Sequence, residues 1–214
     1  MAKKKPCIVI DPGHGGEDVG AVGHNQIEEK MVALSIGKLV KNYLVRKGHK
    51  ALLTRNTDDF IMLNKRTAHA NAAGADLFIS VHANASLNKN AVGIETFFYP
   101  HGHGQLQENQ YTLYMKAYLT KKALFAQMLA QNIQQALCDQ VFSIHAISNI
   151  IDRKVKKAPM QVLIGTNQPS VLVEVGFLTN PYEGTLLATK KYQENIAQGI
   201  VKGILNYLDK MSSL

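Results

Sequence analysis

The stretch that decides the fold is "CIVIDPGHGGEDVGAVG" (residues 7–23), a short apolar segment that runs into a glycine-rich loop. Its first four residues are apolar and mostly β-branched, which predicts a buried strand, and Asp-Pro-Gly ends that strand. A single histidine, His14, follows between glycines. Glycines permit sharp backbone turns and close approach of other groups. We therefore expect His14 to stand at a strand end where a bulky substrate can approach it.

Segments typical of strands and helices alternate along the rest of the chain. Further strands are expected at 50–55, 76–83, 93–100, 160–165 and 170–177, and helices at about 28–47, within 58–75, at about 114–137 and around 192–208. This alternation is typical of an α/β domain. The sequence predicts one α/β domain over residues 7–214, with a mostly parallel central sheet of about six strands and helices on both faces. Residues 1–6 form a basic N-terminal tail ahead of it.

Composition narrows the classes of partner. The 214 residues carry a formal charge of +8, which favours a polyanionic partner such as nucleic acid, acidic lipid or an anionic cell-surface polymer. No RNP-like aromatic motif and no basic stripe on a helix is present, so we do not expect nucleic acid. No apolar stretch reaches the roughly 18 residues needed to span a membrane. The opening "MAKKKP" is not followed by an apolar segment, so no export signal is visible.

Four polar residues occupy positions where an α/β sheet collects ligands, at the carboxyl ends of strands. His14 and His82 follow strands, Glu174 interrupts the apolar strand "VLVEVGF", and Glu29 opens the helix after the glycine loop. Two imidazoles and a carboxylate make a zinc site with one position left for water, and a second carboxylate can move protons. The spacing alone leaves another interpretation open, in which His14 and His82 are hydrogen-bonded structural residues.

Successive blocks of the chain resemble one family. These blocks are "IVIDPGHGGEDVGAVG", "EKMVALSIGKLV", "LLTRNTDDFIMLNKRTAHANAAGADLFISVHANA", "GIETFFY" and "PSVLVEVGFLTNP". In this order they resemble the zinc-dependent N-acetylmuramoyl-L-alanine amidases of the amidase-3 group of peptidoglycan hydrolases. The resemblance runs from about residue 7 to about 208 and is weak over 100–157.

The resemblance implies the roles of the four residues. His14, Glu29 and His82 match the family's zinc ligands, and Glu174 matches its catalytic carboxylate. Glu29 is chosen over Glu28 because the family glutamate precedes a lysine, as Glu29 precedes Lys30. The implied reaction cleaves the amide bond between N-acetylmuramic acid and the L-alanine of the stem peptide. Zinc-activated water is the implied nucleophile, and the glutamate acts as general acid and base.

Other residues near these blocks have two open interpretations. Arg55 and Asn84 either orient the ligands or make structural hydrogen bonds. Asp11 either hydrogen-bonds a ligand histidine or caps the turn. His24 either touches substrate or is exposed. In the segment 101–121, Glu108 is a candidate for the glutamate that blocks the zinc in some family members.

The resemblance also implies partners and place. A peptidoglycan muropeptide is the expected substrate, anionic wall polymers are further candidate partners, and a monomer is expected. The family works mostly in the periplasm or at the cell wall. Two other functions remain open: a zinc hydrolase that cuts another peptide or acetamide, and a wall-binding module without chemistry. The second requires a broken ligand set, whereas all four residues are present here.

Overall fold

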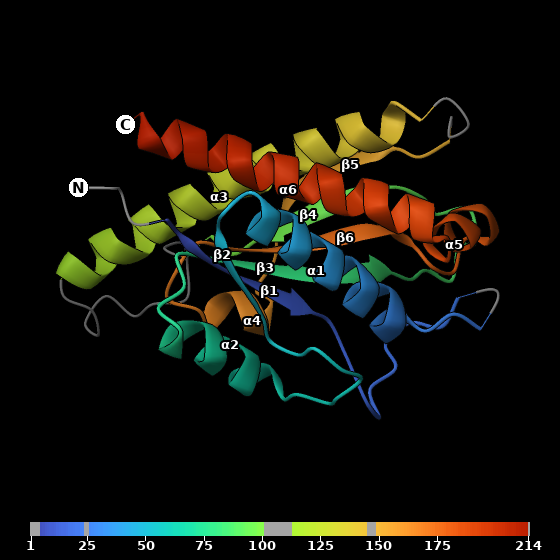
Figure 1. Cartoon of the computed structure of the whole chain (residues 1–214), viewed down its shortest axis with the longest axis horizontal. Helices are drawn as coiled ribbons and strands as arrows, with labels where there is room; N and C mark the ends of the chain where they lie inside the picture. Colours follow the sequence, from blue (N-terminus) through green and yellow to red (C-terminus); the bar gives the residue numbers. More distant parts are fainter. Residues whose placement is uncertain (1–4, 24–25, 101–112, 145–148, 214) are drawn as a thin grey trace.

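A six-stranded sheet forms the centre of the computed structural model, which describes residues 5–23, 26–100, 113–144 and 149–213 (Figure 1). The strands are β1 (Cys7–Pro12), β2 (Lys50–Leu53), β3 (Leu77–Asn84), β4 (Ile94–Phe98), β5 (Asp152–Lys157) and β6 (Ser170–Phe177). Their spatial order is β2-β1-β3-β6-β4-β5. Neighbouring strands run parallel except for the β4–β6 pair, which is antiparallel. The predicted α/β class and mostly parallel sheet are confirmed.

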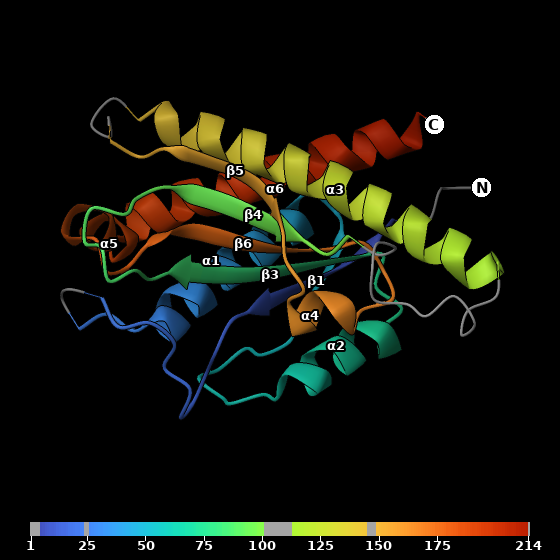
Figure 2. The same cartoon turned by 180° about the vertical axis from the view of Figure 1, so that it is seen from behind.

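Helices cover both faces of the sheet (Figures 1 and 2). They are α1 (Glu29–Arg46), α2 (Leu63–Ala72), α3 (Leu113–Phe142), α4 (Gln161–Ile164), α5 (Pro181–Leu187) and α6 (Lys190–Ser212). The larger core packs α1, α3 and α6 against one face, and a smaller core packs α2 and α4 against the other. No helix of the described residues is long and apolar enough to cross a membrane.

The central strands are the ones that the sequence marks most clearly. Strand β1 is buried along its whole length, and β3 is buried up to His82. Side chains of a strand alternate between its faces, so Phe78 faces α2 and α4, and His82, four residues on, shares that face. On β6, Leu172 belongs to the same smaller core, and Glu174, two residues on, shares its face. The side chains of His82 and Glu174 therefore project from the same face of the sheet, near the carboxyl ends of their strands.

Two segments of the sheet differ from the prediction. The segment 160–165 was expected to be a strand but contains the short helix α4. Strand β5 was not expected at all. A short apolar run such as "QVLI" fits a buried helical turn as well as a strand, because periodicity cannot separate them at that length. Strand β5 reads "DRKVKK" and lies at the sheet edge, where its side chains are only partly buried or exposed, so the apolar signal of a strand is missing.

The helices lie close to where they were expected. Helix α1 begins at Glu29, and α2 ends at Ala72, just before the predicted stop at Gly74. Helix α6 spans the whole predicted apolar stripe. Helix α3 continues to Phe142, five residues past the expected end, and α5 was not expected. The tail at residues 1–6 stays a prediction, because residues 1–4 lie outside the described part of the chain.

Candidate metal centre

His14 is held at the end of β1 in an unusual backbone conformation. Its φ is 58°, in the left-handed region that residues with a side chain rarely adopt. Its Nδ1 lies 2.8 Å from Asp18 Oδ2, so the other ring nitrogen, Nε2, is directed toward Glu29, 3.1 Å from Oε2. Burial alone lowers the pKa of His14, but hydrogen bonds and charge from Glu29 and Asp18 outweigh it and raise the pKa.

Glu29 is the first residue of α1 and is buried between the two histidines. Its Oε1 lies 2.8 Å from His82 Nδ1 and accepts from the Ala83 amide, and its Oε2 accepts from the Ala21 amide at 2.9 Å. Burial raises the pKa of a carboxyl group, yet the contacts with His14 and His82 outweigh burial and hold the pKa of Glu29 well below its usual range. The side chain is therefore an ionised, oriented carboxylate.

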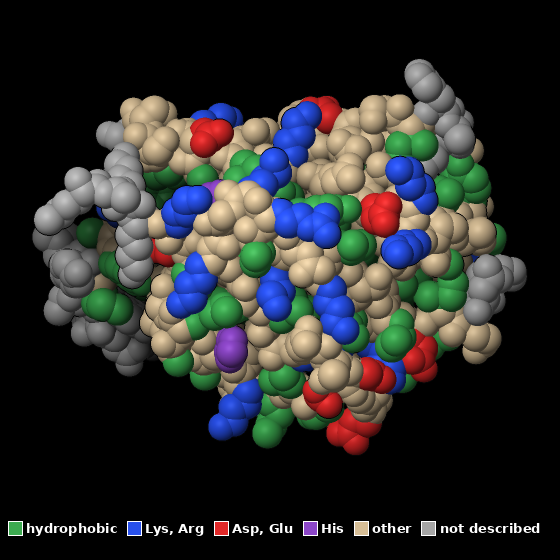
Figure 3. Space-filling model, viewed as in Figure 1, with side chains coloured by type: hydrophobic (Ala, Val, Ile, Leu, Met, Phe, Trp, Pro, Cys, Tyr) green, Lys and Arg blue, Asp and Glu red, His purple; other side chains and the backbone are tan. Residues whose placement is uncertain are grey.

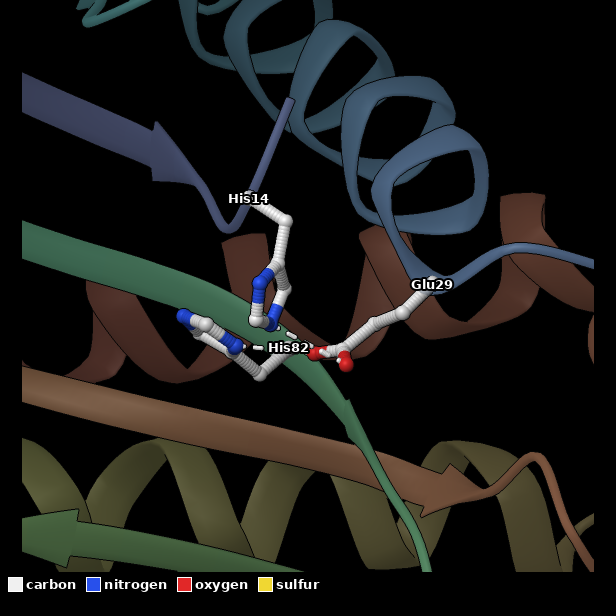
Figure 4. Close-up of side chains that lie close together, drawn as sticks. All are labelled: His14, Glu29 and His82. Atoms are coloured by element: carbon white, nitrogen blue, oxygen red, sulfur yellow. Dashed lines mark hydrogen bonds and ion pairs between the residues drawn. The ribbon is translucent and has the colours of Figure 1, made fainter. Parts of the chain in front are cut away.

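His14, Glu29 and His82 converge on one point, although they are far apart in the sequence (Figure 4). One ligand atom from each lies within 4.8 Å of the others. The two imidazole rings stand edge to face with centroids 4.8 Å apart. Because metal–nitrogen bonds to zinc are about 2 Å long, one ion fits between these atoms after only small side-chain adjustments. The donor set of two imidazoles and a carboxylate is the one that zinc sites with an open position use.

Glycines make room for this cluster. A Cβ on Gly13 would lie 2.3 Å from His82 Cε1, and one on Gly20 would lie 2.6 Å from both Glu29 Oε2 and His14 Cδ2. A Cβ on Gly15 would meet the carbonyl oxygen of Asp59 at 2.1 Å. The expectation that the glycines beside His14 let a substrate approach stays a prediction, because the atoms nearest to an added Cβ at these positions belong to the protein itself. The glycines leave space for the ligand side chains and for a neighbouring backbone segment.

Glu174 lies on β6 beside His82 on β3, which is its register partner. Its Oε2 is buried and has no hydrogen-bond partner among the described residues. Burial raises the pKa of Glu174 to about 7, and the negative charges of Glu29 and Glu95 add to this effect. A buried polar atom without a partner is costly, so such an atom next to a cluster of ligand atoms indicates a chemical role.

Arg55, Asn84 and Asp11 lie around the centre without touching the three converging atoms. The guanidinium of Arg55 donates to the carbonyl oxygens of Pro12, Gly13 and Lys30, which ties the loop of His14 to the first turn of α1. These are structural hydrogen bonds, and an orienting role of Arg55 stays a prediction.

The other residues of this group make structural contacts where they are described. Among the described residues, the Asp11 carboxylate accepts from Thr54, Ser80 and a buried guanidinium, that of Arg66, and contacts neither histidine. Asn84 donates to Glu95 at 2.8 Å. His24 and Glu108 lie outside the described residues.

Three residues with contacts around the site were missed by the sequence reasoning. Asp18 orients His14, and Arg66 donates to the carbonyl oxygens of Pro12 and His14 while pairing with Asp11. Glu95 is the register partner of Glu174 and is held by Arg153 and Lys156. Asp18, four residues after His14, could have been suspected from its spacing, but the partners of the other two are distant in the sequence.

A cavity of about 340 Å³ opens beside the histidines. His14, His82 and Asp18 line one side of it, and the segment from Phe60 to Leu63 lines the other. Phe60, Met62 and Leu63 are each about half exposed, which gives the centre an apolar wall at its entrance. A substrate group with both polar and apolar parts can therefore reach the histidines from solvent.

The chain matches the family model described as N-acetylmuramoyl-L-alanine amidase over residues 8–206. It belongs to this amidase family. Among curated relatives, N-acetylmuramoyl-L-alanine amidase AmiA of Escherichia coli is 35% identical, over 95% of this chain and 76% of that protein. The amidase family expected from the quoted motifs is thereby confirmed.

Two solved structures of amidases share the fold over nearly their whole length. An N-acetylmuramoyl-L-alanine amidase from Clostridium difficile superposes with a TM-score of 0.79 at 34% identity, covering 96% of this chain and 97% of that one. The CwlD amidase from Clostridioides difficile, solved in complex with the GerS lipoprotein, gives a TM-score of 0.80 at 27% identity, covering 96% and 100%. The single α/β domain is thus the fold of known amidases.

Proposed function

We propose that this amidase cleaves the bond between N-acetylmuramic acid and the L-alanine of the peptidoglycan stem peptide, with zinc held by His14, Glu29 and His82. The observation that carries the proposal is the convergence of their three ligand atoms within 4.8 Å. They converge beside Glu174, whose buried Oε2 has no partner among the described residues. The membership of the chain in the amidase family supplies the substrate class.

Each side chain has a distinct task in this proposal. His14, Glu29 and His82 hold the metal, Asp18 fixes the orientation of the His14 ring, and Arg55 fixes the loop that carries His14. A bound zinc ion supplies Lewis-acid chemistry, because it polarises a carbonyl oxygen and makes water more acidic. The cavity beside Phe60–Leu63 receives the substrate at the centre.

Glu174 moves the proton. A divalent cation nearby favours the carboxylate form of Glu174, so the side chain starts as a base. It takes a proton from the attacking water and then gives it to the departing alanine nitrogen, which leaves as an amine. Burial raises the pKa of Glu174 and a bound cation would lower it, and these opposing effects leave a group that can accept a proton and then donate it.

The substrate sets the place of action. Peptidoglycan lies outside the cytoplasmic membrane, so we propose that the protein works in the periplasm or at the cell wall, as a monomer. Zinc hydrolases that cut other peptides or acetamides would use the same four side chains. The product therefore decides between the two activities.

The test is mass spectrometry of muropeptides digested by the protein with and without a chelator. The proposal predicts stem peptides with a free N-terminal alanine, their loss on chelation, and their return when zinc is added back. Cleavage at another bond would reject the substrate, and cleavage that survives chelation would reject the metal.

A further inference from the structure

A second cavity lies away from the metal centre, in a groove between the C-terminal half of α1, the middle of α6 and the end of α3. Its volume is about 660 Å³. Three exposed cations, Arg46, Lys47 and Lys202, line it together with the amides of Gln140, Gln198 and Asn206. Helix α1 has its first residue, Glu29, in the metal centre and its last, Arg46, in this groove. At about 1.5 Å per residue the two sites lie roughly 25 Å apart.

The surroundings of this groove are strongly basic. Between Lys30 and Asp58 the sequence contains no acidic residue. Among the described residues, Arg46, Lys47 and Lys202 form no ion pair. Lys and Arg side chains are spread over the face formed by α1 and α6, with fewer acidic side chains between them (Figure 3). One acid, Asp209, lines the groove.

The positive electrostatic potential near the groove affects the pKa of a neighbouring histidine. The pKa of His49, just past the end of α1, is lowered by burial and then by the charge of Lys5; the charge of Asp209 opposes this shift and that of Lys47 adds to it, so the cations outweigh the one acid of the groove. Cations at a helix C-terminus also stabilise the helix dipole, which accounts for Arg46 and Lys47 taken alone. It does not account for Lys202, which lies in the middle of α6 and projects into the same groove.

We propose that the groove of Arg46, Lys47 and Lys202 binds phosphodiester groups of an anionic cell-wall polymer and so retains the enzyme at its substrate. This inference rests on the proposed function, because that function places the protein at the wall. Guanidinium, ammonium and amide groups all donate hydrogen bonds to phosphate oxygens. A groove lined by such donors suits a linear chain of phosphates and polyols.

A lipid surface fits the groove less well. Membrane-binding faces combine cations with exposed large apolar side chains that enter the bilayer. The large apolar side chains that line the groove are Tyr43, Val201 and Leu205, and none of them is exposed. The observations therefore favour a polymer.

The experiment measures binding of purified poly(glycerol phosphate) as a function of salt. It compares the wild type with the variant R46Q/K47Q/K202Q and with the control K89Q/K116Q/K157Q, which removes three exposed cations outside the groove. Vesicles of phosphatidylglycerol serve as the lipid probe.

We expect the groove variant to bind the polymer at least about tenfold more weakly at low salt. Its salt slope should fall by about 2, since each phosphate contact contributes roughly 0.7. We expect the control to bind within twofold of wild type.

Other outcomes overturn the proposal. These are equal binding by the groove variant and wild type, an equal loss in the control, or a loss that is confined to the vesicles. Hydrolysis of a soluble muropeptide is measured in parallel and should be the same for all three proteins, because the groove lies far from the metal centre. If the wild type fails to hydrolyse it, the proposed function fails, while the polymer assay still decides the groove.

Discussion

At the scale of single residues, the contact with Asp18 determines which nitrogen of His14 faces Glu29. The contact at 2.8 Å between the Asp18 carboxylate and Nδ1 leaves Nε2 free to bind a metal. Replacing Asp18 with Asn removes the charge that favours this arrangement. We expect zinc affinity to fall about 10- to 100-fold, as is typical when the partner of a ligand histidine is lost. A competition titration with a zinc-binding dye measures the change.

The matched control for this prediction is Glu17→Gln. Glu17 is exposed and adjacent to Asp18, so its replacement removes the same charge from the same loop. Zinc affinity of the control should remain that of the wild type. Equal losses in both variants would mean that general charge, and not orientation of His14, sets the affinity.

Glu174 allows the sharpest separation of metal binding from chemistry. Replacing it with Gln keeps the shape of the side chain and removes its ability to take up and release a proton. We expect zinc content to remain unchanged and turnover to fall by about 10² to 10⁴, the usual contribution of a general acid–base group. Metal analysis and product release from the same preparation measure the two quantities. Near-normal turnover by this variant would remove Glu174 from the mechanism.

At the scale of elements, one buried guanidinium joins α2 to the end of β1. Arg66, only 2% exposed, pairs with Asp11 at 2.9 Å and donates to the carbonyl oxygens of Pro12 and His14. Arg66→Met leaves Asp11 as a buried, uncompensated charge, so we expect the free energy of unfolding to fall by about 3–5 kcal/mol. Urea denaturation measures it. Lys65→Met, at the exposed neighbouring position of α2, should change it by less than about 1 kcal/mol.

Glu183 links α5 to the end of β6 and makes stability depend on pH. It is fully buried, and burial raises its pKa to about 7, although hydrogen bonds from the amides of Phe177 and Gly93 oppose the shift. Because the folded state holds this proton more tightly than the unfolded state, whose pKa is near 4.5, stability falls as the pH rises from about 4.5 to about 7.

The change expected from Glu183 over that range is about 3 kcal/mol. Glu183→Gln cannot titrate, so its loss of stability between pH 4.5 and pH 7.5 should be smaller than that of the wild type by about this amount. Urea denaturation of both proteins at both pH values measures the difference. Parallel pH profiles for the two proteins would show that Glu183 does not titrate in this window.

At the scale of the whole molecule, the sequence predicted the parts of the fold whose signals are local. The buried strands β1 and β3 carry uninterrupted apolar runs and the amphipathic helix α6 carries a long apolar stripe, and all three lie where they were expected. Strand β5 was missed because an edge strand needs no apolar side chains, and the "QVLI" segment is too short for its period to be read. Local patterns thus predict the centre of the sheet better than its edge.

In the candidate site, too, the residues with local sequence signals were predicted and those defined by distant contacts were not. His14, Glu29, His82 and Glu174 were selected because strand ends and motifs are visible in one dimension. Supporting contacts are not visible in this way. The pair of Arg66 with Asp11 spans 55 positions, and the contact of Glu95 with Arg153 spans 58. Such contacts follow only from the strand order, which a single sequence does not specify.

The account depends most on one zinc ion held between His14, Glu29 and His82. X-ray diffraction from zinc-loaded crystals at the zinc absorption edge tests this directly. The account predicts an anomalous peak between the two imidazoles and the Glu29 carboxylate, about 2 Å from each ligand atom. An empty position there, or full zinc occupancy only at other side chains, would contradict it.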